Sequence, residues 1–232
     1  MFLPNLYGAV HLAFARRNRP AEEIASSIDF AYKVFQRLFS SSAKRIVNVS
    51  SQGVYGNTDL IREETTAPAP SSSYMMAKYA TEKILEICAG SSNKDYTSLR
   101  LDLVTQSQNV IVGLCKQAIH GKMFLQGGEQ RFSFIDADDA VAAVTAMLFS
   151  PAGWDDIYNV GWNKVRYTLV ELAEIIADAA FECGLKRPKV ILDKQDTSLW
   201  AGMDSSRFQS HTGWMPKVEL RETVQKYIAD LI

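Results

Sequence analysis

The sequence predicts an α/β protein in which a sheet of parallel strands is flanked by helices. Short β-type runs alternate with helical patterns along most of the 232 residues, and parallel strands need crossover helices of this kind. The composition agrees, because 47% hydrophobic and 22% charged residues are typical of a globular chain with a substantial core. We find no internal repeat and no low-complexity tract.

The elements of the first half follow from hydrophobic spacing and from turn residues. Serines 71–73 offer an N-cap for a helix that Gly90 can end. The expected elements are a strand at 8–12, a helix over 21–40 with apolar residues Ile24, Ile28, Ala31, Val34, Phe35 and Leu38 on one face, a strand at 44–50, a loop over 51–72, a helix to about 90 and a strand at 97–103.

The second half shows shorter elements and no clear linker. We expect a helix near 109–120, a strand near 122–126, an extended segment at 131–135, a helix over 137–149, a strand in IYNVGW, a helix over 168–182, a strand in PKVILD and a final helix at about 219–231. The simplest reading is one compact unit, with a core lobe over 1–105 and a mixed α/β lobe over 106–232 that is interleaved with the core.

Charge and residue usage exclude several classes of function. A formal charge of -1 and a pI near 6.3 give no footprint for nucleic acid or an anionic membrane, so we expect a small-molecule partner. Three separated cysteines without a CxxC motif indicate reduced thiols in the cytoplasm. The histidines are isolated, so we expect no metal site. The N-terminus lacks the basic start and cleavage site of a signal peptide, and no apolar run reaches membrane-helix length.

Two tyrosines are each followed four places later by a lysine, Tyr74 by Lys78 and Tyr79 by Lys83. Residues at i and i+4 share one helix face, so the ammonium can lie near the phenolic oxygen. Acid–base work near pH 7 needs a phenol pKa about 3 units below its usual value of about 10. A lysine at about 4–5 Å supplies roughly 3–4 kcal/mol toward this shift at an effective dielectric near 20. The spacing alone leaves both pairs open.

The surroundings distinguish the pairs. The stretches RIVNVSSQGVYG and PAPSSSYMMAKYATEKIL resemble the extended short-chain dehydrogenase/reductase family, which contains nucleotide-sugar epimerases and dehydratases. That family carries a strand ending in Ser-Ser before VYG, then S-x-Y-x-x-x-K-x-x-x-E. Only Tyr74 and Lys78 fit, with Ser73 ahead of them and Glu82 behind. We interpret Tyr79 and Lys83 as a helix-surface tyrosine and a solvated lysine.

The resemblance continues through GAVHLAF, FIDADDAVAAV, YNVGW and DSSRFQSHTGWMPKVEL. It implies that Leu12, Ala13 and Phe14 lie near the cofactor. Two readings are open for Asp138 and Asp139, a catalytic carboxylate pair or groups that cap and orient the following helix, and we favour the second.

The resemblance implies a Rossmann-type cofactor-binding core, a substrate-binding second lobe, and an NAD(P)-dependent epimerase- or dehydratase-like reaction at a hydroxyl or carbonyl carbon. Tyr74 would exchange a proton with the substrate, and Lys78 would lower the pKa of Tyr74 and hold the nicotinamide ribose. Ser51 would hydrogen-bond the reacting oxygen. The family also implies NAD or NADP as cofactor, a nucleotide sugar as a candidate substrate, and a homodimer.

The substrate residues depart from the family's pattern. Gln52 and Gly53 stand where sugar dehydratases carry an acidic pair, Leu103 stands where epimerases place an asparagine, and Arg131 is one position out of register with a phosphate-binding arginine. We expect Ser51, Gln52, Leu103 and Arg131 to face the substrate. A reductase or dehydrogenase acting on another hydroxyl or carbonyl compound stays open.

The phosphate-binding motif is the largest departure. None of the 13 glycines forms GxGxxG or GxxGxxG, and the sequence opens at what resembles the family's fourth strand. We therefore expect the first βαβαβ unit to be absent, which would leave a normally central strand at a sheet edge. Three explanations are open: an incomplete chain, a remodelled relative, or an edge completed by another chain. The alternative function is a non-catalytic binding or regulatory protein.

Overall fold

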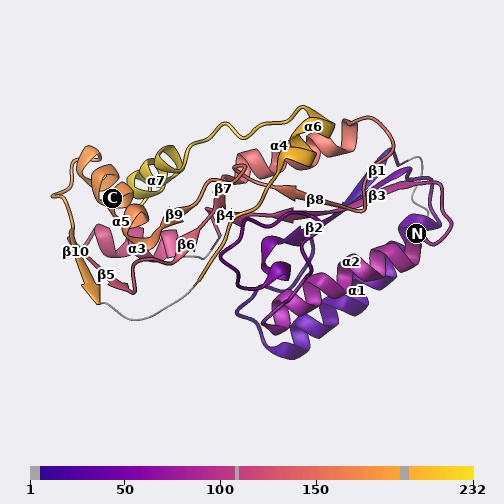
Figure 1. Ribbon diagram of the computed structural model, residues 1–232, viewed down its shortest axis with the longest axis horizontal. Coiled ribbons are helices and arrows are strands. Elements are labelled where there is room, and N and C mark those ends of the chain that lie inside the picture. Colours follow the sequence, from indigo (N-terminus) through magenta and orange to yellow (C-terminus); the bar gives the residue numbers. More distant parts are fainter. Residues whose placement is uncertain (1–5, 108–109, 194–198) are drawn as a thin grey trace.

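The computed structural model describes residues 6–107, 110–193 and 199–232 (Figure 1). Its elements are β1 Gly8–His11, α1 Ala21–Phe39, β2 Arg45–Ser51, the 3₁₀ helix η1 Gln52–Tyr55, α2 Ser73–Ala89, β3 Asp95–Leu101, β4 Leu103–Val104, α3 Val110–Ala118, β5 Lys122–Gln126, β6 Arg131–Phe132, β7 Phe134–Ile135, α4 Ala137–Phe149, β8 Ile157–Val160, β9 Tyr167–Thr168, α5 Leu169–Glu182, β10 Lys189–Asp193, α6 Ser206–Thr212 and α7 Leu220–Ala229.

The central sheet has four parallel strands in the order β1-β2-β3-β8. Helices α1 and α2 cover one face and α4 covers the other, as Figure 1 shows. Neighbouring residues of β2 alternate between the two faces, because Ile46 packs with Phe35 and Leu85 while Val47 packs with Leu99 and Met147. Within the described residues, β1 forms one edge of this sheet.

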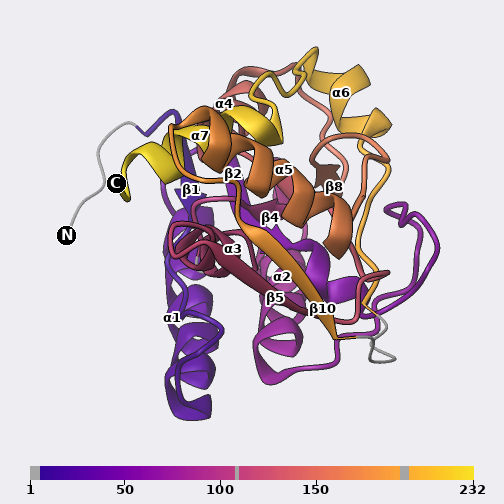
Figure 2. The ribbon, with the colours of Figure 1, turned by 90° about the vertical axis from the view of Figure 1, so that its left-hand side faces the viewer.

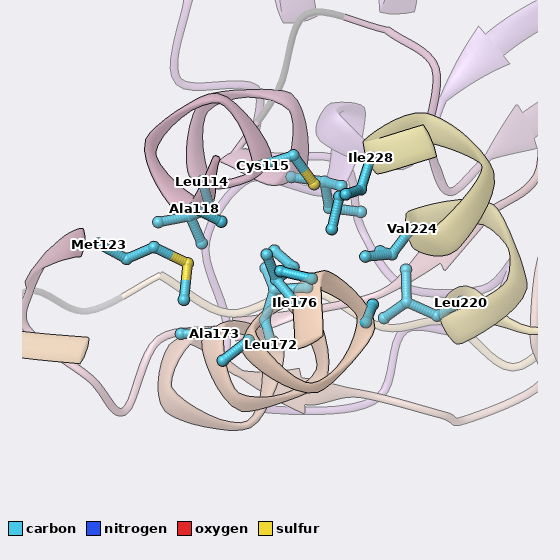
Figure 3. Close-up of a cluster of buried hydrophobic side chains, with 14 of the residues drawn as sticks. Leu114, Cys115, Ala118, Met123, Leu172, Ala173, Ile176, Leu220, Val224 and Ile228 are labelled. Carbon is cyan, nitrogen blue, oxygen red and sulfur yellow. The ribbon is translucent and has the colours of Figure 1, made fainter. Parts of the chain in front are cut away.

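A second hydrophobic cluster joins α3, α5 and α7 to the parallel pair β5–β10. Figure 3 shows Leu172 and Ile176 of α5 in one cluster with Cys115 of α3 and Val224 of α7. Figure 2 shows β5 and β10 side by side against these helices. The chain enters this region after β4 and returns to the central sheet at β8, so elements of the second half complete the first.

Most sequence predictions of elements are confirmed. The predicted strand at 122–126 and the predicted helix over 137–149 match β5 and α4, and the other predicted strands and helices agree to within a few residues at their ends. Two predictions were wrong: the strand expected at 97–103 breaks at Asp102, and the extended segment at 131–135 is divided at Ser133 into two short strands. The beginning of the helix expected near 109 lies outside the described residues. Sequence reasoning missed α6 and β9.

Capping explains why α2 begins and ends where it does. The Ser72 side chain accepts a hydrogen bond from the Met75 backbone N–H, and Gly90 follows the helix with a φ of +51° that residues other than glycine seldom adopt. These two ends fix the span of α2, in which Tyr74 and Lys78 share one face.

The described helices include none long and apolar enough to cross a membrane. Over the same residues, no group of three or more His, Cys, Asp or Glu side chains is arranged to hold a metal ion.

Candidate active site

Tyr74, Lys78 and Glu82 stand at successive i, i+4 positions of α2. They form a polar row that faces strand β2. The Lys78 ammonium donates a hydrogen bond of 2.9 Å to the backbone carbonyl of Val49 in β2. Lys78 and Glu82 are each 5% exposed, so this face of the helix is pressed against the sheet. The row begins with Tyr74 in the first turn of α2, beside the carboxyl end of β2.

Glu82 anchors this row to two strands. Its carboxylate accepts hydrogen bonds from Arg100 Nε at 3.0 Å and from Arg100 Nη2 at 2.7 Å, and a third from the Ser50 hydroxyl. The two charged side chains are almost fully buried, at 3% and 1% exposure. Because a bidentate ion pair has a fixed geometry, it sets the position of α2 against β2 and β3.

Ser51 lies at the carboxyl end of β2 and caps η1. Its Oγ accepts a hydrogen bond of 3.1 Å from the Gly53 N–H. Gly53 lies against Met75, the residue after Tyr74, and a Cβ added at Gly53 would approach Met75 Cγ to 3.0 Å. The end of β2 and the first turn of α2 therefore meet closely, which brings the predicted Ser51 and Tyr74 to one part of the molecule.

Phe14 closes the other side of the pair. Its ring meets the Tyr74 ring edge-on, with centroids 5.9 Å apart, and its centroid lies 4.3 Å from the Lys78 ammonium. A partly buried cation–π contact of this kind is worth about 0.5–2 kcal/mol. The sequence placed Leu12, Ala13 and Phe14 together, but in the structure Leu12 and Ala13 are exposed and only Phe14 contacts the Tyr–Lys pair.

The electrostatics of the pair differ from the prediction. Burial raises the pKa of the Tyr74 phenol above its usual value, and the nearby Arg17 charge opposes this only in part. Burial also lowers the pKa of Lys78 to about 8, against the opposite pull of Glu82. We expected Lys78 to lower the pKa of Tyr74. In this structure the cost of burying a phenolate outweighs nearby positive charge, while the Lys78 ammonium is directed at Val49 and the Phe14 ring.

The tyrosine of the second Tyr/Lys pair is less exposed than predicted. Tyr79 is half-buried and packs against a cluster of Val54, Tyr55 and Met203. Lys83 is exposed and pairs with Glu86 at 2.8 Å on the same helix. The description of Tyr79 as a surface tyrosine was therefore wrong, because a loop from the second half of the chain covers it.

Gln52, predicted to face the substrate, is buried in a polar cluster. Its side-chain amide donates toward Ser133 Oγ at 3.4 Å, and its carbonyl accepts from Arg62 Nη1 and from the Gly202 N–H, each at 3.4 Å. Ser133 donates in turn to Asp102 Oδ1 at 2.5 Å. These hydrogen bonds link η1 to the segment around Asp102, which leads into the second hydrophobic cluster, and to the segment around Ser133, which leads out of it.

Arg131 lies beside this polar cluster and Leu103 lies behind it. The Arg131 guanidinium stacks 5.8 Å from the Trp200 ring, and the Trp200 carbonyl accepts a hydrogen bond from buried Arg62. Leu103 packs instead against the hydrophobic cluster of α3, α5 and α7. The structure therefore brings Gln52 and Arg131 into contact with one loop, residues 199–202, and it turns Leu103 toward the apolar core.

The carboxylates at the start of α4 have structural roles. Asp136, not Asp138 or Asp139, is the N-cap, and it accepts a hydrogen bond of 2.9 Å from the Asp138 N–H. Asp139 is buried and accepts hydrogen bonds from the backbone N–H groups of Lys217 and Val218, each at 2.9 Å. The preferred reading, in which these residues cap and orient the helix, needs one correction: the capping residue is Asp136.

Sequence reasoning missed Asp102, Arg62 and Trp200. Asp102 is fully enclosed, and burial raises the pKa of its carboxyl to about 7 against the opposing effects of Ser133 and Arg62. Two charged residues that alternate with leucines, as in LRLDL, were the available signal for Asp102. Arg62 and Trp200 stand in loops, where the sequence offered no periodicity to single them out.

A comparison with protein families decides the broader assignment. The profile of the NAD dependent epimerase/dehydratase family matches residues 5–161, which is more than half of the chain. The chain belongs to this family. No curated protein matches the sequence closely enough to count as a relative.

Solved structures share the fold of this family member at low sequence identity. The RMD structure from Pseudomonas aeruginosa complexed with NADPH has a TM-score of 0.84 at 18% identity, over 99% of this chain and 84% of that chain. A UDP-glucose 4-epimerase with UDP-glucose from Thermotoga maritima has a TM-score of 0.81 at 23% identity, over 96% and 76%. A UDP-glucuronic acid 4-epimerase from Bacillus cereus in complex with NAD scores 0.82 at 18% identity, over 98% and 75%.

These likenesses establish a Rossmann-like parallel sheet with flanking helices, as predicted. The matches cover nearly all of this epimerase/dehydratase-family chain, and so they do not bear out the expectation of an absent N-terminal unit. The chain in turn spans about three-quarters to four-fifths of the matched chains.

Proposed function

We propose that this chain is an NAD(P)-dependent enzyme that acts on a hydroxyl or carbonyl carbon of a nucleotide sugar, with Ser51, Tyr74 and Lys78 as its catalytic residues. One observation carries the proposal. Tyr74 and Lys78 lie on one face of α2, against the end of β2 that carries Ser51, in a chain of the epimerase/dehydratase family. Carboxyl ends of parallel strands are where ligands bind in sheets of this type.

The residues present fit the nicotinamide end of a dinucleotide. Lys78 supplies an ammonium for the ribose hydroxyls, and Tyr74 supplies a phenol beside it on the same helix face for the reacting oxygen. When bound, the nicotinamide supplies hydride transfer. The usual binding element for the pyrophosphate is not found, because the sequence contains no glycine-rich turn of the usual spacing.

Each residue of the proposed site has a separate task. Tyr74 Oη exchanges a proton with the substrate hydroxyl, and Ser51 Oγ donates a hydrogen bond to the same oxygen. Lys78 holds positive charge near the phenol, which favours the phenolate once the site admits a polar ligand. Gln52 and Arg131 border the loop around Trp200, which we assign to the substrate side.

The substrate class rests on the neighbours and on the family. Structures with the same fold were solved with UDP-glucose, UDP-glucuronic acid, NAD and NADPH. We therefore propose a nucleoside diphosphate sugar as substrate and either NAD or NADP as cofactor. The choice between the two cofactors rests on a contact with the adenosine ribose, for which the described site offers no candidate residue.

A second candidate function is a non-catalytic binding or regulatory role. The observations that favour it are the Phe14 ring over Lys78 and the raised pKa of Tyr74, because the pair is covered and its phenol is held in the neutral form. The missing glycine-rich motif points the same way.

Calorimetric titration of the purified chain with NAD, NADH, NADP and NADPH separates the two candidates, after the protein has been checked for cofactor carried through purification. Micromolar binding followed by turnover of UDP-glucose or UDP-glucuronic acid supports the enzyme. Absence of binding at millimolar cofactor refutes it and leaves the non-catalytic role.

A further inference from the structure

The Lys78 ammonium is inaccessible in this structure, although the proposed function needs it to touch a ligand. It is covered by β2 on one side, through Val49, and by the Phe14 ring on the other. The strand is part of the central sheet and is held by its two neighbours. Of the two covers, only Phe14 belongs to a segment that can move without breaking the sheet.

The segment that carries Phe14 is irregular and lightly held. Residues 12–20 have no helix or strand, and both residues before Phe14 are exposed. The Ala15 N–H donates to Ser27 Oγ at 2.9 Å, which ties the segment to α1 just after the ring. Phe14 itself is only half-buried, unlike Phe35 of α1, which is completely enclosed in the core. Few contacts and irregular backbone are the features of segments that open locally.

The space next to Phe14 can receive its ring. An open cavity of about 610 Å³ is lined by Phe14, Ala15, Arg16, Asn18, Arg19 and Glu23. The cavity lining includes Glu23 of α1 but neither Tyr74 nor Lys78, so a ring in the cavity would have left the Tyr–Lys pair. A change of the Phe14 rotamer toward the cavity would remove the ring from Lys78 without displacing another side chain of the core.

We propose that Phe14 is a gate on the Tyr74–Lys78 pair: its ring closes the pair in the free protein and moves into the adjoining cavity when the pair receives a ligand. The ligand in question is the one given under the proposed function, a nicotinamide nucleotide. Phe14 is thus a positioning residue. Closed, it buries the phenol and the ammonium; open, it exposes both to a polar ligand.

The gate can be tested without any cofactor, through the reactivity of Lys78. The rate of acetylation of Lys78 is measured by mass spectrometry as a function of pH. The midpoint of this rate curve reports the pKa of Lys78, and the limiting rate at high pH, the plateau, reports its accessibility. Exposed Lys83 on the same helix is the internal reference. In the unmodified protein we expect a midpoint of about 8 and a plateau at least tenfold below that of Lys83.

Phe14→Ala should raise the Lys78 plateau about tenfold and move the midpoint upward by at least one pH unit, with Lys83 unchanged. The matched control is Phe181→Ala, which removes an exposed ring from α5 in the other lobe and should leave both Lys78 values unchanged. Phe14→Leu serves as the second variant if Phe14→Ala does not fold, and should give a smaller rise in the plateau. A Lys78 plateau equal to that of the unmodified protein in these Phe14 variants overturns the gate.

Titration with NADH and NADPH distinguishes failure of the gate from failure of the proposed function. If the closed state competes with binding, Phe14→Ala should bind the cofactor about tenfold more tightly, because the open fraction rises. If Lys78 becomes reactive in Phe14→Ala but neither this variant nor the unmodified protein binds cofactor, the gate stands and the proposed function fails. If cofactor binds while the Lys78 plateau is the same in Phe14→Ala as in the unmodified protein, the proposed function stands and the gate fails.

Discussion

Glu82 and Arg100 form a buried, two-pronged ion pair between α2 and β3. The carboxylate accepts two hydrogen bonds from the guanidinium, at 3.0 and 2.7 Å, and a third from the Ser50 hydroxyl. Glu82 stands one helical turn after Lys78 and two after Tyr74. The pair therefore fixes the helix face on which the proposed chemistry depends, although it lies away from the proton-transfer atoms.

Removing one partner of this pair should destabilise the fold strongly. We expect Glu82→Ala to lower the free energy of unfolding by about 3–5 kcal/mol, because it leaves the Arg100 charge buried without its partner. Glu86→Ala removes an exposed carboxylate from the same helix and should cost no more than about 1 kcal/mol. Urea unfolding of both variants measures the difference. Equal losses in the two variants would show that the buried pair does not hold α2.

The two tyrosines of α2 should differ in their effect on turnover. If the proposed function holds, Tyr74→Phe should lower kcat by about 100-fold or more, because the proton-exchanging hydroxyl is lost. Cofactor affinity should change little, because Lys78, the proposed ligand of the ribose, is unchanged. Tyr79→Phe is the matched control, and its kcat should stay within about twofold. Steady-state kinetics with UDP-glucose checks this, and undiminished turnover by Tyr74→Phe would sink the assignment of Tyr74.

Asp102 should make the stability of the protein depend on pH. Burial raises the pKa of its carboxyl to about 7 from a usual value of 3.8, so folding favours the protonated form. The stability associated with this group is fully present below about pH 4 and is lost as the pH rises through 7. Asp102→Asn keeps a neutral side chain at all pH values, so its melting temperature should fall less between pH 5 and about 8.

The control for this measurement is Asp59→Asn, which changes an exposed carboxylate. Its melting curve against pH should run parallel to that of the unmodified protein. If the Asp102→Asn curve is also parallel, the carboxyl of Asp102 is ionised in the folded protein and the raised pKa is refuted.

Gly161 should tolerate no side chain. A Cβ at this position would lie 1.9 Å from Asp102 Oδ2 and 2.6 Å from Asp102 Cγ, well inside contact distance. We expect Gly161→Ala to cost about 1–3 kcal/mol of stability, because the buried carboxyl cannot withdraw without losing Ser133. Gly113→Ala, with open space around it in α3, should instead stabilise the protein by about 0.5–1 kcal/mol. Thermal unfolding compares the two, and a neutral Gly161→Ala would contradict the close packing.

The sequence by itself determined the elements and the helix face of the proposed site. Hydrophobic spacing defined α1 and α4, and Ser72 with Gly90 set the ends of α2. The i, i+4 spacing of Tyr74 and Lys78 then required both side chains to share one face. These features depend on neighbours within a few residues along the chain, which is why a linear pattern reveals them.

Only the tertiary structure decided what surrounds those side chains. Phe14 covers Lys78 from 64 positions away in the chain, and Asp102 meets Ser133 and Gly161 only because three segments converge. The direction of the pKa shift of Tyr74 follows from the same cause, since burial depends on which distant segments exclude water from the phenol. A sequence pattern shows which groups can act together, whereas the environment that sets their charge is created by packing between segments that the pattern does not connect.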